Sequence, residues 1–202
     1  PTSVTAMVDN GQATVSFTAP ASVGGTAITG YTVTSSPGGI TATGTGSVTL
    51  QSTAGGIGLT GGVTTNTGNL TLNSPVAVIQ GSGALTGASL SLVGSATSYT
   101  LANTSNNMSS VAGTVASLSY VNSNALSLGA LTLTGVLDVA TLTGDLTVAG
   151  NVATTSTASN AITLNAGKNS PAGTGSGGNV IISGTPTLSV GTGGRATLYT
   201  GT

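Results

Sequence analysis

The sequence predicts an all-β protein, and three observations support the prediction. Short stretches in which an apolar residue, a Thr or Ser and another apolar residue alternate recur along most of the 202-residue chain. Such alternation places apolar side chains on one face of a strand and hydroxyl groups on the other. No stretch carries the spacing of an amphipathic helix, and Gly or Asn interrupts the chain every few residues.

The predicted strands follow one another at short intervals. They cover residues 13–17, 31–34, 70–72, 90–92, 99–101, 118–120, 126–128, 131–133, 146–148, 162–164, 180–182 and 188–190. From about residue 46 onward the triplets return every roughly 16 to 20 residues, a length typical of one turn of a parallel β-helix. Turns of such a solenoid bury their inner faces by stacking on one another. We therefore expect residues 47–202 to form a β-helix repeat region of about seven or eight turns.

The composition favours a narrow aliphatic core with tight corners. Apolar residues make up 38% of the chain but aromatic residues only 2%, with no Trp. Corners between strands need residues that accept positive φ, and Gly and Asn at 67–69, 166–167, 177–179 and 193–194 are expected to supply them. Stacked Asn residues are expected to form side-chain ladders along the axis.

Charged residues are too few for most catalytic chemistry. The chain has only Asp9, Asp138, Asp145, Lys168 and Arg195, and it lacks His, Glu and Cys. Acid–base catalysis, thiol nucleophiles and transition-metal sites need residue types that are absent or isolated here. The sequence therefore predicts no enzyme activity and no catalytic, cofactor-binding or metal site.

Asp138 and Asp145 are the one pair of residues that could resemble a catalytic site, because some β-helix enzymes hold two acidic residues in one groove. No Glu, His or basic residue stands nearby to tune these acids, so we interpret them as solvated turn carboxylates. Lys168 and Arg195 are expected on loops or outer faces, where they aid solubility.

The charge balance also limits the kinds of partner that the protein is expected to bind. A net charge of -1 leaves no basic patch for nucleic acid. Near-zero charge favours self-association. The apolar runs are too short for a membrane-spanning helix, so no membrane insertion is expected. The chain opens at Pro1 without a signal peptide, and we expect it to be a mature segment of something larger.

Four stretches of the repeat region resemble a known family. NTGNLTLNSP at 66–75, LTGDLTVA at 142–149, AITLNAG at 161–167 and GGRATLYTG at 193–201 look like the repeats of filamentous-haemagglutinin-like exoproteins. These are very large bacterial surface proteins. The resemblance implies a right-handed parallel β-helix, exported to the cell exterior at the bacterial surface.

Residues 1–46 resemble the front half of a bacterial fibronectin type III module. The resemblance rests on PTSVTA at 1–6, GQATVSFTAP at 11–20 and GTAITGYTVT at 25–34. It implies an N-terminal partial β-sandwich, although Phe17 stands where the family usually has Trp and the back half is missing. An isolated half-sandwich leaves edges unpaired. Strands of a neighbouring copy could complete it, it could cap the first solenoid turn, or the sequence could join two pieces; we favour completion or packing within an assembly.

The functional hypothesis follows from the solenoid and its ends. Solenoids need polar caps to stop stacking, and the stretch at 198–202 has none. We expect a non-enzymatic homopolymer, a bacterial surface fibre assembled by end-to-end stacking and strand complementation through the chain ends. The alternatives are an adhesin or a spacer stalk of a large exoprotein, with contact to a cell surface or glycan.

Two further patterns suggest surface roles. Thr pairs at 41/43/45, 132/134, 141/143 and 185/187 could align into the flat face of an ice-binding β-solenoid, although their spacing is uneven. Asn69, Asn103 and Asn107 each begin a glycosylation acceptor pattern.

Overall fold

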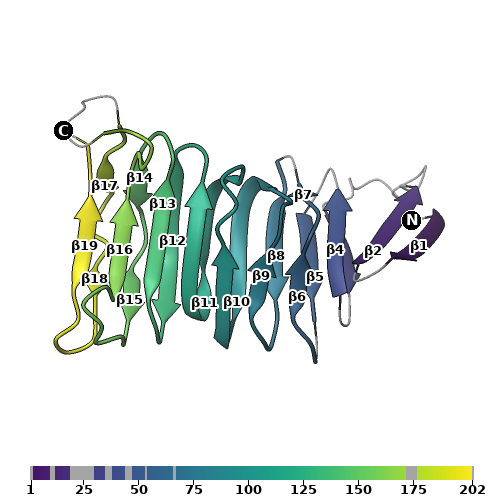
Figure 1. The fold of residues 1–202 in the computed structure, drawn as a ribbon, viewed down its shortest axis with the longest axis horizontal. Helices are drawn as coiled ribbons and strands as arrows, with labels where there is room; N and C mark the ends of the chain where they lie inside the picture. The colour runs from purple at the N-terminus through teal and green to yellow at the C-terminus, as the bar shows by residue number, and fades with distance from the viewer. Residues whose placement is uncertain are drawn as a thin grey trace.

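The computed structural model describes residues 47–201 except 53, 66 and 172–176, together with the backbone of the strands at 2–9, 12–18, 30–34 and 38–43. Within these ranges the regular secondary structure consists of β-strands alone, and the strands form a parallel β-solenoid of about six turns. Figure 1 shows the turns stacked side by side along one axis, with β1 and β19 at opposite ends. The all-β fold and the parallel solenoid are confirmed.

Two columns of hydrogen-bonded parallel strands build the rod. Ladder 1 consists of β3 (Gly30–Thr34), β5 (Ser47–Gln51), β8 (Asn69–Asn73), β10 (Leu85–Leu101), β11 (Asn107–Asn122), β12 (Leu126–Leu133), β14 (Leu146–Val148) and β17 (Val180–Ile182). Ladder 2 consists of β6 (Ile57–Leu59), β9 (Val78–Gln80), the later parts of β10 and β11, β13 (Leu137–Thr141), β16 (Ile162–Asn165) and β19 (Ala196–Tyr199). Two shorter columns complete the pairing. In one, β4 (Gly38–Thr43) pairs with β7 (Val63–Thr64). In the other, β12 pairs with β15 (Val152–Thr154), which in turn pairs with β18 (Leu188–Ser189).

Strands β10 and β11 belong to both ladders because each bends around a corner of the rod. The pairing between them shifts register between Gly94 and Ser98. Gly94 has a φ of 130°, a conformation that side chains disfavour. The sequence pattern predicted only the short stretches 90–92 and 99–101 within β10 and 118–120 within β11. The two long strands join the two ladders at the middle of the rod.

The N-terminal strands extend the parallel pairing across residue 46. β1 (Thr2–Asp9) and β2 (Gln12–Thr18) form an antiparallel pair. β2 then pairs in parallel with β4, and β3 pairs in parallel with β5. The side chains of residues 1–46, Phe17 and Asp9 included, lie outside the described residues, so the fibronectin-like half-module and the division at residue 46 stay predictions.

The final turn is much longer than the sequence spacing predicted. Side-chain hydrogen bonds between successive turns join residues 19 to 23 positions apart in the middle of the rod. In the last turn the bonds from Asn179 to Asp145 and from Thr187 to Asn151 span 34 and 36 positions. This long final turn is why the rod has about six turns instead of the expected seven or eight.

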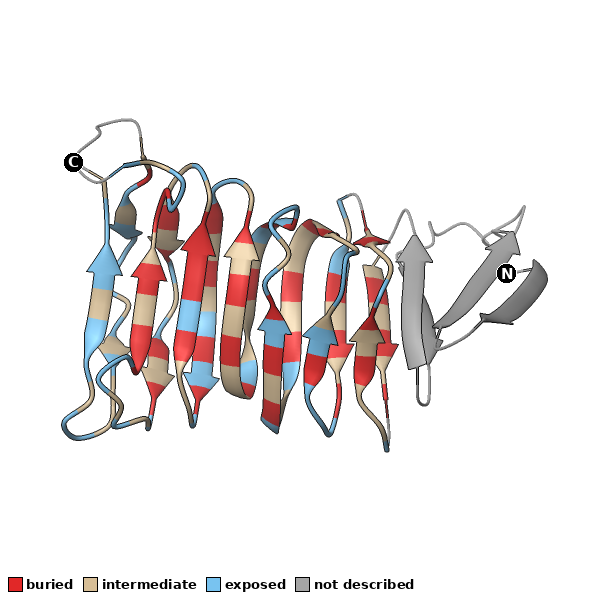
Figure 2. Ribbon diagram, viewed as in Figure 1, coloured by how far each residue is buried: buried red, intermediate tan, exposed pale blue. Residues whose placement is uncertain are grey.

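The core is a narrow stack of aliphatic rows that runs the length of the rod. Register places Val48, Leu70, Leu90 and Val111 in one such row, and each is at most 2% exposed. The alternating buried bands along the strands in Figure 2 show the same inward rows. The alternation of apolar and polar residues along the strands therefore builds the narrow aliphatic core that the composition predicted.

Two of the four tyrosines lie inside this core with their hydroxyl groups hydrogen-bonded. Tyr99 Oη, which has one proton to donate, lies within hydrogen-bond distance of Val93 O (2.6 Å) and Leu72 O (3.0 Å). Tyr120 Oη donates to Asn122 Oδ1 (2.9 Å). Buried tyrosine hydroxyls generally find such partners. Desolvation raises the pKa of Tyr99 to about 12, against the smaller opposing effect of its backbone hydrogen bonds, and desolvation likewise raises the pKa of Tyr120.

Buried side-chain amides close one corner of the rod. Asn122 Nδ2 donates to the carbonyl groups of Met108, Asn124 and Ala125, and Asn122 Oδ1 accepts from Met108 N. Within the described residues no buried side-chain nitrogen or oxygen atom lacks a partner. Asn124 Nδ2 donates to Asn107 Oδ1 (3.2 Å), which is one contact between two Asn residues. The expected Asn ladders along the axis stay a prediction.

Candidate functional site

The final turn of the rod exposes the residues that earlier turns bury. Ile182 stands in register with Val148 and Leu198 with Leu164. Val148 and Leu164 are 0% exposed, but Ile182 is 47% and Leu198 41% exposed. Figure 2 shows the contrast, because β19 carries no buried band whereas β16 does. The inner row thus ends on an uncovered apolar surface, which we call the open end.

The backbone of the open end is paired on one side. β17, β18 and β19 pair with β14, β15 and β16, respectively. In the part of the chain that the structure describes, no strand pairs with the opposite edge of these three strands. On this edge the Val180 N–H donates to Thr200 Oγ1 (3.0 Å). The rest of the strand edge lies beside an apolar row, an arrangement that favours the addition of another strand layer.

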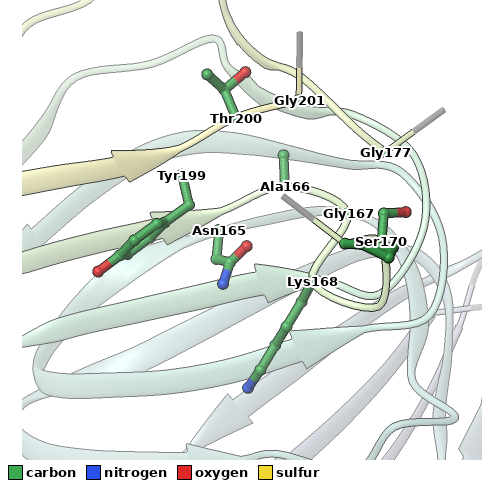
Figure 3. Close-up of a pocket in the computed structure, with 10 residues that line it drawn as sticks. Asn165, Ala166, Gly167, Lys168, Ser170, Gly177, Tyr199, Thr200 and Gly201 are labelled. Atoms are coloured by element: carbon green, nitrogen blue, oxygen red, sulfur yellow. The ribbon is translucent and has the colours of Figure 1, made fainter. Parts of the chain in front are cut away.

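A cavity of about 240 Å³ lies beside the open end, on the outer side of ladder 2. Its described lining includes Asn165 and Tyr199, which are register partners on β16 and β19, and Lys168 and Ser170 from the loop after β16. In Figure 3 the side chains of Asn165, Lys168 and Tyr199 extend to the same side, away from Ala166 and Thr200. Amide, ammonium and aromatic groups therefore border one hollow.

The structure separates the two acids whose pairing was considered. Asp138 lies exposed on β13, in the outward row of ladder 2 between Ser119 and Thr163. Asp145 lies at the corner before β14, where its Oδ1 accepts the backbone N–H of Asn179 (2.8 Å). Asp145 thus holds the long final turn against the preceding one. No group of three or more His, Cys, Asp or Glu that could hold a metal ion occurs among the described residues.

The two basic residues lie on surface positions. Lys168 is exposed in the loop after β16, and Arg195 is exposed in the turn before β19. The solubility role assigned to them stays a prediction. No helix within the described ranges is long and apolar enough to span a membrane.

The register does not align the Thr pairs on one face. Thr132 and Thr134 are exposed, but Thr141 is buried and donates to Gly144 O (2.8 Å) while Thr143 is exposed. Thr185 and Thr187 lie in the loop between β17 and β18 and not on a strand. The group at 41/43/45 has no described side chains. Among the described positions, the pairs at 132/134, 141/143 and 185/187 form no continuous threonine array.

The three glycosylation acceptor patterns differ in whether the fold already uses the side-chain nitrogen of the Asn in a hydrogen bond. Asn103 Nδ2 donates to the carbonyl oxygens of Gly81 (3.3 Å) and Ser82 (2.7 Å). Asn69 and Asn107 are exposed, and in each the side-chain oxygen accepts a hydrogen bond. Of the three, Asn103 is the one whose described amide nitrogen is already used by the fold.

The fold and the open end place this chain in the class of parallel β-solenoid proteins. No family model, no curated protein and no solved structure matches the chain. The resemblances to haemagglutinin-like repeats and to a fibronectin type III module therefore stay predictions.

The sequence pattern predicted the open end but not the cavity. The cavity depends on the pairing of Asn165 with Tyr199, which lie 34 positions apart because the last turn is long. A pattern that assumes a repeat of about 20 residues does not bring them together.

Proposed function

We propose that this chain is a non-enzymatic structural subunit of an extracellular bacterial surface fibre, in which copies join end to end through their solenoid turns. The observation that carries the proposal is the open end, where Ile182 and Leu198 remain exposed although their register partners are fully buried. A further turn from a second copy would cover this row and pair the free strand edges.

Strand addition is the physical basis of the joint. A new layer of strands about 4.8 Å beyond the open end would bond to the free edges of β17, β18 and β19. The complementary surface is the N-terminal end of another copy, where β1 to β4 lie beyond β5 and β6 along the rod (Figure 1). Because the two joining surfaces differ, the contact is head-to-tail and yields an open filament.

The scarcity of charge supports the same assembly. With two basic and three acidic residues in the whole sequence, little repulsion opposes contact between copies. The location outside the cell rests on the resemblance to exported repeats. The non-enzymatic role rests on the lack of His, Glu and Cys and on the separation of Asp138 from Asp145.

Electron microscopy of the purified protein over a concentration series tests the proposal, with two variants of β19. Leu198→Lys puts a charge into the exposed inner row, and Thr197→Lys puts the same charge on the outward face of the same strand. We expect fibres from the unaltered protein and from Thr197→Lys, but only short rods from Leu198→Lys. Because Leu198 is already 41% exposed, the thermal unfolding of a dilute sample should change little.

Two results would contradict the proposal. Isolated rods of the unaltered protein at every concentration would indicate a spacer or adhesin segment of a longer surface protein. Fibres that persist in Leu198→Lys would show that the copies associate through some surface other than the open end.

A further inference from the structure

The cavity beside the open end brings together side-chain types that this sequence almost lacks. Lys168 is one of only two basic residues in the chain. Tyr199 is one of four tyrosines, and it is 54% exposed whereas Tyr99 and Tyr120 are 1% exposed. Both border the same cavity of about 240 Å³ together with Asn165. In a chain whose outer surface is made mainly of Ser, Thr, Asn and Gly, this grouping distinguishes the cavity chemically.

The backbone holds the lining residues in place. Ala166 N donates to Tyr199 O (2.9 Å), which ties the end of β16 to β19. Lys168 N donates to Thr141 O (2.8 Å), and Ser170 N donates to Gly167 O (2.8 Å). The loop after β16 is thereby attached to the turn that precedes it. The three side chains rise from paired strands and a bonded loop, so little order has to be created when a ligand binds.

We propose that this cavity binds one acidic sugar residue, a pyranose that carries a carboxylate group. The exposed ring of Tyr199 offers an apolar platform for the C–H face of a pyranose. The Asn165 amide has both donors and an acceptor for ring hydroxyl groups. The Lys168 ammonium, on the same side in Figure 3, supplies a positive charge for the carboxylate.

The size and the charge of the cavity set the ligand class. Sites for drug-sized ligands occupy roughly 300–1,000 Å³, so a cavity of about 240 Å³ suits a single ring. Only one basic residue lines it, which matches a ligand with one carboxylate better than a multiply charged phosphate or sulfate. Asn165 and Tyr199 alternate with the inward residues Leu164 and Leu198 on β16 and β19, and Lys168 comes from a loop, so none of the three belongs to the inner row proposed for fibre assembly.

Binding of methyl glucuronide and of its neutral match, methyl glucoside, tests the inference. Titrations followed by the backbone amide signals of residues 165–170 would report both affinity and location. We expect the glucuronide to bind about two- to fivefold more tightly than the glucoside, the range of an exposed ion pair. Lys168→Gln should remove this preference and leave glucoside binding unchanged. Tyr199→Ala should weaken the binding of both sugars.

Arg195→Gln is the matched control, because it removes the other basic residue, which is absent from the cavity lining. It should leave both affinities unchanged, and thermal unfolding should confirm that every variant is folded. Equal affinity for the two sugars, or a preference that survives in Lys168→Gln, would overturn the assignment to an acidic sugar. An absence of signal changes at residues 165–170 with either sugar would overturn the site itself.

Discussion

Single residues in a core this narrow must satisfy their polar atoms without help from water. Tyr99 is the largest such case, with its hydroxyl group bonded to Val93 O and Leu72 O. Tyr99 follows directly after the register shift between Gly94 and Ser98 on β10. Both rings that the described part of the core buries, those of Tyr99 and Tyr120, have a hydrogen-bond acceptor within reach of the hydroxyl group.

Replacing this hydroxyl group should cost stability. We expect Tyr99→Phe to lower the free energy of unfolding by about 1–2 kcal/mol, because the buried Leu72 carbonyl and the part-buried Val93 carbonyl lose the hydroxyl donor within their reach. Tyr199→Phe is the control, since Tyr199 is 54% exposed. Denaturant unfolding of both variants at a low protein concentration measures the difference. Equal stability of the two variants would show that the buried hydroxyl contributes nothing.

The same residue makes the fold sensitive to alkali. Burial raises the pKa of Tyr99 from 10.0 to about 12, so the unfolded chain loses the proton first as pH rises. The free energy of unfolding should be constant below about pH 9 and fall between about pH 10 and pH 12. The raised pKa of Tyr120 acts in the same direction. Unfolding measured across this range in Tyr99→Phe should show a shallower decline.

Close backbone contact, as well as positive φ, explains the glycines. Gly167 and Gly193 have the predicted positive φ, at 68° and 81°, whereas Gly178 does not. A Cβ atom on Gly178 would lie 1.9 Å from Gly144 O. We expect Gly178→Ala to destabilise the protein by about 3 kcal/mol through overpacking. Gly184→Ala, with a φ of 81° and no atom within 4 Å of the added Cβ, should cost only about 1 kcal/mol in thermal unfolding.

At the scale of elements, each turn is fixed by its corner as much as by its strands. The corner at Asn122 joins the end of β11 to the start of β12 through bonds to Met108, Asn124 and Ala125. The bonds to Asn124 and Ala125 fix the local shape of the corner, and the bonds to Met108 tie that corner to the start of β11.

Removing this buried amide should therefore affect more than one strand. We expect Asn122→Ala to lower the free energy of unfolding by at least about 2 kcal/mol, since several buried backbone groups lose their partner. Asn124→Ala removes an exposed amide from the same corner and should change stability by less than about 0.5 kcal/mol. Chemical unfolding of the pair measures the contrast, and similar losses in both would contradict it.

Strand positions were predictable from sequence because alternation is a local property. All twelve predicted stretches overlap strands of the structure, and 146–148 and 180–182 coincide with β14 and β17. The corner bends of β10 and β11 were not predictable, because Gly94 looks like any other breaker in the sequence. Strand β13 shows the same limit, since the pattern at 137–141 lacks a Thr or Ser between its apolar residues. The cavity required the register of the last turn, which depends on tertiary pairing.

For the whole molecule, stability should vary along the rod. Solenoid turns are held mainly by their nearest neighbours, so the central turns gain from two sides and the final turn from one. We expect backbone amides of β17 to β19 to exchange with solvent hydrogen much faster than those of β10 and β11 in dilute samples. Under conditions that favour fibres, the amides of β17 to β19 should become protected. Hydrogen exchange read by mass spectrometry follows both states, and unchanged exchange in fibres would place the joint elsewhere.

The direction of the ladder bonds also determines how the rod would respond to mechanical force. In the stack of Figure 1 the bonds between turns point along the rod axis, while the covalent chain winds around it. A pull along the axis therefore loads the hydrogen bonds of one layer together, and rupture would release one whole turn. A turn of about 20 residues extends to roughly 70 Å once freed. Such a rod would lengthen in steps, layer by layer, and each released loop would lower the tension on the layers that remain.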